Sequence, residues 1–195
     1  MIWAILLAAG QGRRFGGDKL AAPMPDGTPM VVAAARQLMK ALPDSTLAVI
    51  RPGAAEIAAL LHAEGVRVIA CQEAALGMGH SLSRGIAATP HADGWMVALG
   101  DMPLIDSSTV HVLAARLKAG ALLATPCHRG RGGHPVAFAR ALRSELLHTC
   151  GDTGARDVLR RHARHLHRVA VDDPGIHIDI DTPGQLRSAM LNLPR

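Results

Sequence analysis

The sequence contains few aromatic residues and no tyrosine. Two Phe and two Trp make up 2% of its 195 residues. Proteins that bind single-stranded nucleic acid commonly stack the bases on aromatic side chains. The composition therefore gives no support for such a surface, and we expect no nucleic-acid partner.

Cysteine is scarce as well. Cys71, Cys127 and Cys150 are widely separated and odd in number, and no C-x-x-C pair occurs. Zinc ribbons and disulfide-stabilised scaffolds use cysteines at short, paired spacings. We therefore expect three reduced cysteines that pack as small apolar side chains in a reducing compartment.

Long apolar runs are absent. A membrane-spanning helix needs about 20 consecutive apolar residues, and no stretch of the sequence approaches that length. The apolar start, Ile2–Leu7, has no charged leader and leads into a glycine-rich segment, unlike a secretory signal. These features predict a cytoplasmic protein without a membrane partner.

The bulk composition is that of a globular domain. Hydrophobic residues make up 49% of the chain and charged residues 19%, which argues against disorder. A length of 195 residues suits one domain, which we place at 1–195. The net charge of +5 would attract phosphorylated small molecules and nucleic acid alike, so it identifies no partner.

Short apolar runs alternate with segments of helical periodicity. The expected strands are Ile2–Leu7, Thr46–Ile50, Val66–Ala70, Trp95–Leu99, Ala121–Thr125, Pro135–Phe138, Val169–Val171 and Ile176–Ile180. The expected helices are Pro29–Lys40, Ala54–Ala63, Met78–Ala88, a segment capped by Ser107 or Ser108 that ends near Lys118, Ala141–His148, Thr153–His165 with Asp152 as its cap, and Pro183–Leu191 capped by Thr182. This alternation predicts one α/β domain with a doubly wound, mostly parallel sheet and helices on both faces, a Rossmann-like architecture. Such sheets bind ligands beyond the carboxyl ends of their strands.

The first expected strand leads into a glycine-rich, cationic loop. Its glycines and cations are Gly10, Gly12, Gly16, Gly17, Arg13, Arg14 and Lys19. Glycine lets the backbone approach an anion and point N–H groups at it, while the cations neutralise its charge. The loop therefore predicts a phosphate site, with an ordinary strand-to-helix turn as the alternative.

This loop matches neither of two common phosphate motifs. A Walker A loop needs Gly before the lysine and a hydroxyl residue after it, but Asp18 and Leu20 flank Lys19. In the Rossmann pattern G-x-G-x-x-G, counted from Gly10, Phe15 stands where the third glycine belongs.

Carboxylates follow two other expected strands. Asp101 comes directly after a buried strand and a glycine, and Asp179 and Asp181 lie near the end of the last strand. Mg²⁺ prefers carboxylate and phosphate oxygens, so these residues predict a magnesium site. Alternate residues of a strand point to opposite faces, so only one of the last two can join Asp101, and we favour Asp181. The alternative is that these carboxylates belong to helix caps.

Six motifs lie in order along nearly the whole chain. They are L-A-A-G at 7–10, R-F-G-G-x-K at 14–19, G-D-M-P at 100–103, G-G-H-P-V at 132–136, G-D-x-G-A-R at 151–156 and D-I-D-T-P at 179–183. The set resembles the molybdenum cofactor cytidylyltransferases, within the wider MobA-like NTP transferases of nucleotide-diphospho-sugar transferase-like fold. G-x-x-G-H-P followed by G-D-x-G-A-R narrows the resemblance to the molybdenum cofactor branch.

The resemblance implies an Mg²⁺-dependent enzyme that transfers CMP from CTP to the terminal phosphate of molybdenum-loaded molybdopterin. The products would be molybdopterin cytosine dinucleotide and pyrophosphate. Guanylyltransferase relatives typically carry Gly at the position of Ala9, so this residue favours CTP. The alternatives are a guanylyltransferase, another nucleotidyltransferase acting on a small-molecule phosphate, and a non-catalytic carrier of the cofactor.

The resemblance also assigns residues to roles. Lys19, Arg13 and Asp101 would be catalytic, and Asp101 and Asp181 would hold the metal. The predicted nucleotide-binding residues are Leu7, Ala8, Ala9, Gly10, Gly12, Arg14, Lys19, Gly77 and Ser81. The acceptor would meet His134, Gly133 and Asp152. Two positions depart from the pattern: His80 replaces a small residue, and no acidic pair follows Pro183.

Residues 160–168, R-R-H-A-R-H-L-H-R, form the most basic stretch. A solvated helix face is the plain interpretation. The alternative is a transient docking surface for an acidic partner, which the resemblance identifies with a molybdenum hydroxylase or its maturation factor.

Overall fold

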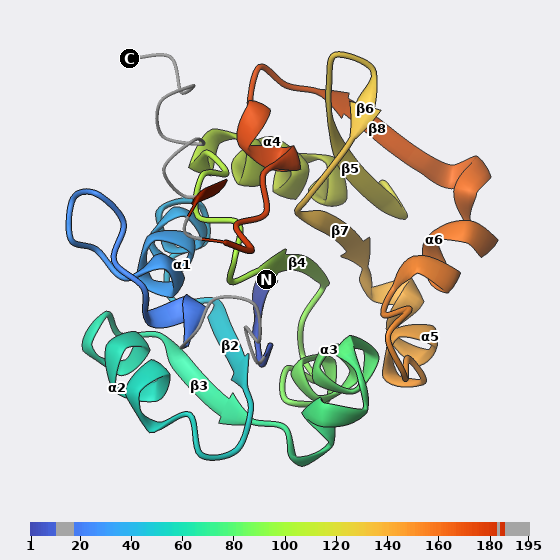
Figure 1. The fold of residues 1–195 in the computed structure, drawn as a ribbon. Helices are drawn as coiled ribbons and strands as arrows, with labels where there is room; N and C mark the ends of the chain where they lie inside the picture. The colour runs from blue at the N-terminus through green and yellow to red at the C-terminus, as the bar shows by residue number, and fades with distance from the viewer. Residues whose placement is uncertain (11–17, 183, 186–195) are drawn as a thin grey trace.

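The computed structural model describes residues 1–10, 18–182 and 184–185. Within that part of the chain, eight strands form one mixed sheet in the order β3-β2-β1-β4-β7-β5-β6, with β8 beside β5 (Figure 1). The strands are β1 (Ile2–Ala8), β2 (Thr46–Ile50), β3 (Arg67–Ala70), β4 (Gly94–Leu99), β5 (Leu123–His128), β6 (Arg131–Gly132), β7 (Val136–Ala139) and β8 (Leu166–Ala170). Strands β1 to β4 pair in parallel, and β7 is antiparallel to β4 and β5.

Helices connect these strands. They are α1 (Met30–Ala41), α2 (Ala55–Ala63), α3 (Met78–Ala87), α4 (Ser107–Lys118), α5 (Arg143–Leu147) and α6 (Arg156–Arg161). Short 3-10 segments are η1 (Lys19–Ala21), η2 (Gln72–Leu76), η3 (Arg140–Leu142), η4 (Ala163–His165) and η5 (Pro174–His177). Over the residues described, none of the helices combines the length and the apolar character needed to cross a membrane.

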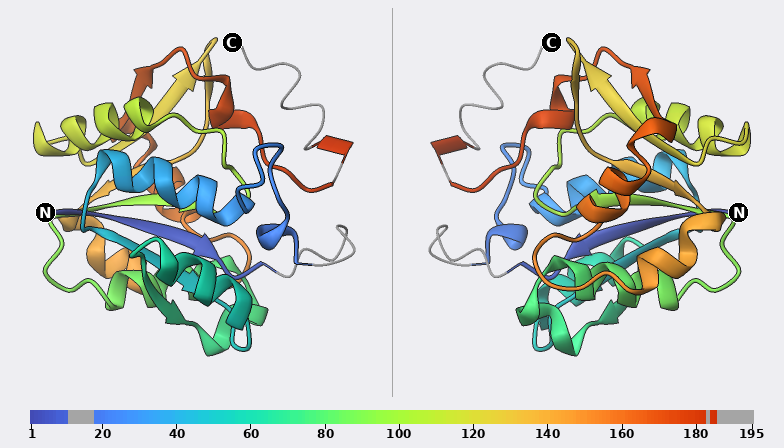
Figure 2. Two further views of the ribbon diagram at one scale, coloured as in Figure 1. Left: turned by 90° about the vertical axis from the view of Figure 1, so that its left-hand side faces the viewer. Right: turned by 90° about the vertical axis from the view of Figure 1, so that its right-hand side faces the viewer.

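Each face of the sheet packs against its own set of helices. Along β1, Ala4 and Leu6 belong to a core shared with α1 and α4, whereas Ile5 and Leu7 belong to a core shared with α3 and α5. Figure 2 shows α1 and α4 on one side of the strands and α3 on the other. The sheet is therefore covered on both faces, which explains why its central strands are apolar without interruption and confirms the expected fold class.

The order of the strands reverses at β1. The chain proceeds from β1 outward to β2 and β3, and then returns to place β4 on the opposite side of β1. In such sheets the carboxyl ends of the strands on either side of the reversal frame the ligand crevice. The segments that leave β1, β2 and β4 bring Gly10, Arg51 and Asp101 to this edge.

The last third of the chain departs from the sequence prediction. The helix expected at 153–165 is limited to Arg156–Arg161, and its N-cap is Ala155 rather than Asp152. Gly151 and Gly154 adopt positive φ values of 60° and 53°, so the chain turns where the helix was expected to begin. The basic stretch is consequently no single helix face, because its end belongs to β8.

The strand expected at 176–180 is also wrong. Pro174 opens the 3-10 segment η5, and the Asp173 carboxylate accepts a hydrogen bond from the Gly175 N–H at 2.9 Å. Proline and an Asx turn favour this compact start over an extended strand.

Two cap predictions have different outcomes. Asp106, rather than Ser107 or Ser108, caps α4 by accepting from the Ser108 N–H. The predicted helix 183–191 lies almost entirely outside the described residues, although Thr182 accepts a hydrogen bond from the Gln185 N–H at 3.2 Å.

The close approach of α3 to the sheet generates a stability prediction. A Cβ at Gly85 would lie 2.6 Å from Ile5 Cγ2 and 3.2 Å from Val49 Cγ2. Gly→Ala in an exposed helix stabilises a protein by about 1 kcal/mol, but overpacking a core typically costs about 1–3 kcal/mol. We expect Gly85→Ala to lower the free energy of unfolding in urea, and an unchanged or higher midpoint would contradict this packing.

Candidate active site

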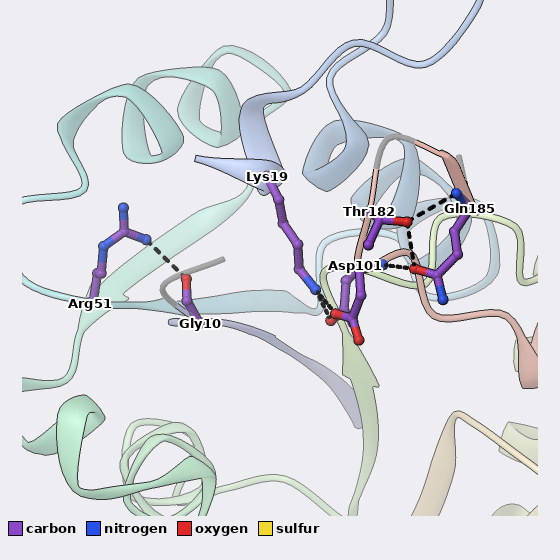
Figure 3. Close-up of polar contacts among 7 residues, drawn as sticks. Gly10, Lys19, Arg51, Asp101, Thr182 and Gln185 are labelled. Atoms are coloured by element: carbon purple, nitrogen blue, oxygen red, sulfur yellow. Dashed lines mark hydrogen bonds and ion pairs between the residues drawn. The ribbon is translucent and has the colours of Figure 1, made fainter. Parts of the chain in front are cut away.

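One lysine joins three distant segments of the chain. Lys19 opens η1, Asp101 follows β4, and Asp181 lies in the irregular C-terminal segment. The Lys19 ammonium donates to Asp101 Oδ2 at 2.8 Å and to Asp181 Oδ1 at 2.5 Å (Figure 3). The two carboxylates therefore converge on a single cation at the carboxyl edge of the sheet.

Backbone contacts place Asp101 and hold the C-terminal segment beside it. The Gly100 N–H donates to the Leu7 carbonyl at 2.9 Å, and a Cβ at Gly100 would lie only 3.3 Å from that oxygen. The Ile180 N–H donates to the Asp101 carbonyl at 2.9 Å. The end of β1 thus positions Asp101, and Asp101 in turn positions Asp181.

The ammonium is buried, whereas the carboxylates reach solvent. The exposed fractions of the side chains are 9% for Lys19, 25% for Asp101 and 38% for Asp181. Burial lowers the pKa of Lys19, but the two carboxylates more than compensate, so its pKa lies above the ordinary value. Lys19 therefore stays charged at neutral pH.

The same two carboxylates are suited to a divalent metal ion. They direct hard oxygen ligands, which Mg²⁺ and Mn²⁺ prefer, at one point, which the Lys19 ammonium occupies in this structure. Across the described residues, no group of three or more His, Cys, Asp or Glu side chains could hold a metal. Phosphate oxygens and water would therefore complete the coordination of a cation held here.

A first cavity of about 610 Å³ opens beside Lys19. Its volume lies within the range of about 300–1,000 Å³ that is usual for ligand pockets. Its lining residues are Leu7, Ala9, Gly10, Lys19, Leu20, Arg51, Pro52, Gln72, Ala74, Ala75, Gly77, Met78, Ser81, Leu99, Asp101 and Asp152. The lining includes the cations Lys19 and Arg51 and several small residues, a suitable environment for a polyphosphate.

A second cavity, of about 380 Å³, shares part of this wall. Leu7, Met78, Leu99 and Asp152 line both cavities. Apolar side chains from β4 and β7 form much of the second cavity, and its polar groups include His134, Arg156 and Arg168. It could therefore receive a ligand that combines an apolar body with an anionic group.

His134 is a half-buried titratable group of the second cavity. Its Nδ1 is buried without a hydrogen-bond partner among the described residues, and its backbone N–H donates to the Ile176 carbonyl at 3.0 Å. Burial lowers the pKa of the imidazole; Asp101 acts to raise it and Arg156 to lower it, and the net shift is downward. The ring is thus a neutral hydrogen-bonding group at neutral pH.

The structure brings most of the predicted site residues to these cavities. Leu7, Ala9, Gly10, Lys19, Gly77, Ser81 and Asp101 line the first cavity, Gly133 and His134 line the second, and Asp152 lines both. Ala8 is buried in the core, 1% exposed. Gly12, Arg13 and Arg14 lie outside the described residues. Asp181 contacts Lys19, whereas Asp179 is exposed.

Sequence reasoning missed several cavity residues. Arg51 directly follows β2, and the criterion that singled out Asp101, a charged residue after a buried strand, would have found it. Arg168 lies on β8, within the stretch that the sequence assigned to a basic surface. No local pattern connects Arg168 with His134, because only the pairing of β8 with β5 brings this strand to the cavity.

His134 makes stability depend on pH. The unfolded chain protonates this residue near its ordinary pKa of 6.5, whereas the folded chain does so only at a lower pH. The neutral His134 therefore contributes its full stabilisation of the folded protein above about pH 6.5. This stabilisation is lost as the pH falls toward the lowered pKa of the folded state. We expect the wild type to lose more stability than His134→Gln between about pH 7.5 and 5.5 in urea unfolding. Parallel pH profiles would contradict the buried, neutral imidazole.

Comparison with known proteins identifies relatives over the whole chain. This chain is 30% identical to nicotine blue oxidoreductase of Paenarthrobacter nicotinovorans over 193 residues. The match covers 95% of this chain and 94% of the relative. The chain is 31% identical to the purine catabolism protein PucB of Bacillus subtilis strain 168, with 92% and 91% covered.

Solved structures resemble the fold. Rv0371c of Mycobacterium tuberculosis H37Rv superposes with a TM-score of 0.85 at 25% identity, covering 98% of this chain and 97% of that chain. A nucleotidyl transferase of Methanothermobacter thermautotroptrophicus superposes with a TM-score of 0.81 at 22% identity, covering 97% and 95%. Residues 4–167, which include most of β1 and the loop of Asp101, match the MobA-like NTP transferase domain. The chain therefore belongs to the MobA-like NTP transferase family.

Proposed function

We propose that this protein transfers CMP from CTP to the terminal phosphate of molybdenum-loaded molybdopterin. Membership of the family supports nucleotidyl transfer in general. The observation that carries the proposal is that Lys19 and Asp101, joined by Asp181, lie at a cavity that shares part of its wall with a second cavity. One cavity suits a nucleoside triphosphate, and the other suits an acceptor with an apolar body and a phosphate.

The reaction needs no covalent intermediate with the protein. An oxygen of the acceptor phosphate attacks the α-phosphorus of CTP, the bond from this phosphorus to the bridging oxygen breaks, and pyrophosphate leaves with that oxygen. The contribution of the chain is to position both substrates and to offset negative charge. Lys19, charged and buried, performs the second role beside the triphosphate.

Asp101 and Asp181 would hold a magnesium ion. A bound Mg²⁺ would supply further neutralisation of phosphate charge. A structure of Rv0371c in complex with manganese, with a TM-score of 0.82 and 24% identity to this chain, supports a divalent metal in proteins of this fold.

The acceptor is proposed to lie in the second cavity. The guanidinium groups of Arg156 and Arg168 would bind its phosphate, and the buried Nδ1 of His134, which has no partner among the described residues, offers a further hydrogen bond. Gly133 packs tightly against Ile176, since a Cβ there would lie 2.3 Å from the Ile176 carbonyl oxygen. The absence of a side chain at Gly133 therefore allows this segment, next to His134, to pack against Ile176.

The choice of nucleotide and acceptor is supported by the motifs. Ala9 lines the first cavity, where its methyl group narrows the space for a base and favours a pyrimidine. G-D-x-G-A-R places Asp152 and Arg156 at the second cavity. A molybdopterin-guanine dinucleotide biosynthesis protein A of Archaeoglobus fulgidus shares the fold, with a TM-score of 0.67 and 22% identity.

Other functions receive less support. A guanylyltransferase or another acceptor would use the same arrangement, and a carrier would need neither Lys19 nor Asp101. One relative is named an oxidoreductase, but the opening loop departs from the dinucleotide-binding pattern at Phe15. Docking to a molybdenum hydroxylase or its maturation factor, and a cytoplasmic location, stay predictions.

Pyrophosphate release tests the proposed reaction. We expect release with Mg²⁺, molybdenum-loaded molybdopterin and CTP, and little with GTP, ATP or UTP. Asp101→Asn should lower kcat about 10²–10³-fold, because the loss of a carboxylate ligand would weaken binding of the metal ion that offsets the charge of the reacting phosphates. The matched control is Glu56→Gln, an exposed carboxylate in the first turn of α2, which should leave the rate unchanged.

Each other outcome of this assay has a defined meaning. Release with GTP rather than CTP would keep the reaction class and refute the argument from Ala9. A folded protein that binds the pterin but releases no pyrophosphate with any nucleotide would be a carrier instead.

The second cavity generates a prediction about the acceptor alone. Arg168→Ala should raise the KM for the acceptor about tenfold and leave the KM for CTP nearly unchanged, because the lost cation faces the second cavity. Arg164→Ala removes an exposed arginine of η4, outside the residues that line this cavity, and serves as the control. Equal effects of the two substitutions in initial-rate kinetics would place the acceptor elsewhere.

A further inference from the structure

Arg51 bridges the two ends of the glycine-rich loop. It follows β2, whose last residue, Ile50, pairs with Ala8 of β1. The guanidinium donates through Nη1 to the Gly10 carbonyl at 3.1 Å and through Nη2 to Asp18 Oδ2 at 2.6 Å. The contact with Gly10 is drawn in Figure 3. One side chain thus holds both described ends of the loop that begins after Gly10 and ends at Asp18.

The ion pair between Arg51 and Asp18 is partly buried. The exposed fractions of the two side chains are 26% and 19%. Asp18 Oδ1 is buried and has no hydrogen-bond partner among the described residues. The charge of this carboxylate therefore depends strongly on Arg51 for its compensation, since burial deprives it of water.

The location of this carboxylate is unfavourable for a polyphosphate site. Asp18 immediately precedes Lys19, and Arg51 and Lys19 both line the first cavity. An uncompensated negative charge here would repel a triphosphate at short range, where screening by solvent is weak. Arg51 removes this repulsion and, through the Gly10 carbonyl, also sets the position of the backbone that follows β1.

We propose that Arg51 is a positioning residue of the nucleotide site, acting through Asp18 and Gly10 rather than on the nucleotide itself. The proposal rests on the proposed function, because it assigns the first cavity to a triphosphate. A guanidinium is needed because its planar fork reaches two acceptors at once, which a lysine ammonium on its flexible stem does less well.

The alternative is that Arg51 binds the triphosphate directly, and a double-mutant cycle separates the two. Equilibrium binding of CTP and of inorganic tripolyphosphate would be measured for the wild type, Arg51→Ala, Asp18→Asn and the double variant. Arg51→Ala should weaken binding of both probes about tenfold. Asp18→Asn alone should change it little, and the double variant should recover most of the loss, because the repelling charge is gone.

Controls separate this role from a loss of stability. Arg36 forms a similar two-contact pair with Glu64, at 2.8 Å for each contact, on the exposed face of α1. Arg36→Ala should leave the binding of both probes unchanged, even if it lowers the melting temperature as much as Arg51→Ala does. Arg51→Lys, which keeps the charge, should bind with intermediate affinity.

A readout without ligand is hydrogen exchange at the amides of Ala21 and Ala22. These amides donate to the carbonyls of Asp18 and Lys19. Exchange at both should be faster in Arg51→Ala than in the wild type, and unchanged in Arg36→Ala.

Two results would overturn the proposal. The first is a double variant that binds as weakly as Arg51→Ala, which would mean that Arg51 does not act by compensating the charge of Asp18. The second is unchanged binding and exchange in Arg51→Ala. A wild type that binds neither probe would refute the proposed function instead, and the exchange experiment would still decide whether Arg51 orders η1.

Discussion

The arrangement of the site depends on the two ion pairs that Lys19 makes with Asp101 and Asp181. They join the segment after β1, the loop after β4 and the C-terminal segment, which lie far apart in the sequence. A buried ammonium is tolerated only where opposite charge compensates for its lost hydration. The requirement for this compensation brings two carboxylates together at one point, and that point is also suited to a divalent cation.

The topology of the sheet explains why the ion pairs of Lys19 form at the carboxyl edge of the strands. Because the strand order reverses at β1, the loops after β1 and β4 leave neighbouring strands in the same direction. The cores on the two faces bury the central strands, so charged residues gather where the strands end. The two cavities share Leu7 and Leu99, near the carboxyl ends of β1 and β4, in their walls.

Local pattern was a reliable guide in the first two thirds of the chain and a poor one beyond it. Uninterrupted apolar runs such as Thr46–Ile50 leave little choice other than a buried strand, and this one has the predicted bounds. Near Gly154 and Pro174 the secondary structure depends on which turn the chain forms, and the alternative turns differ little in energy. Asp181 contacts Lys19, but the strand on which the preference for Asp181 over Asp179 as a metal ligand was based is absent, and that preference stays a prediction.

The sequence by itself determined the fold class and the segments that carry the chemistry. Hydrophobic periodicity, glycine-rich turns and acidic residues at strand ends are local properties, and local physical chemistry suffices to interpret them. Only the tertiary structure decided which of these residues meet. The bridge from Arg51 to Gly10 and Asp18, and the approach of Arg168 to the cavity of His134, arise from strand pairing between segments far apart in the chain. The packing of the whole sheet determines which strands pair, so no short sequence pattern predicts this pairing.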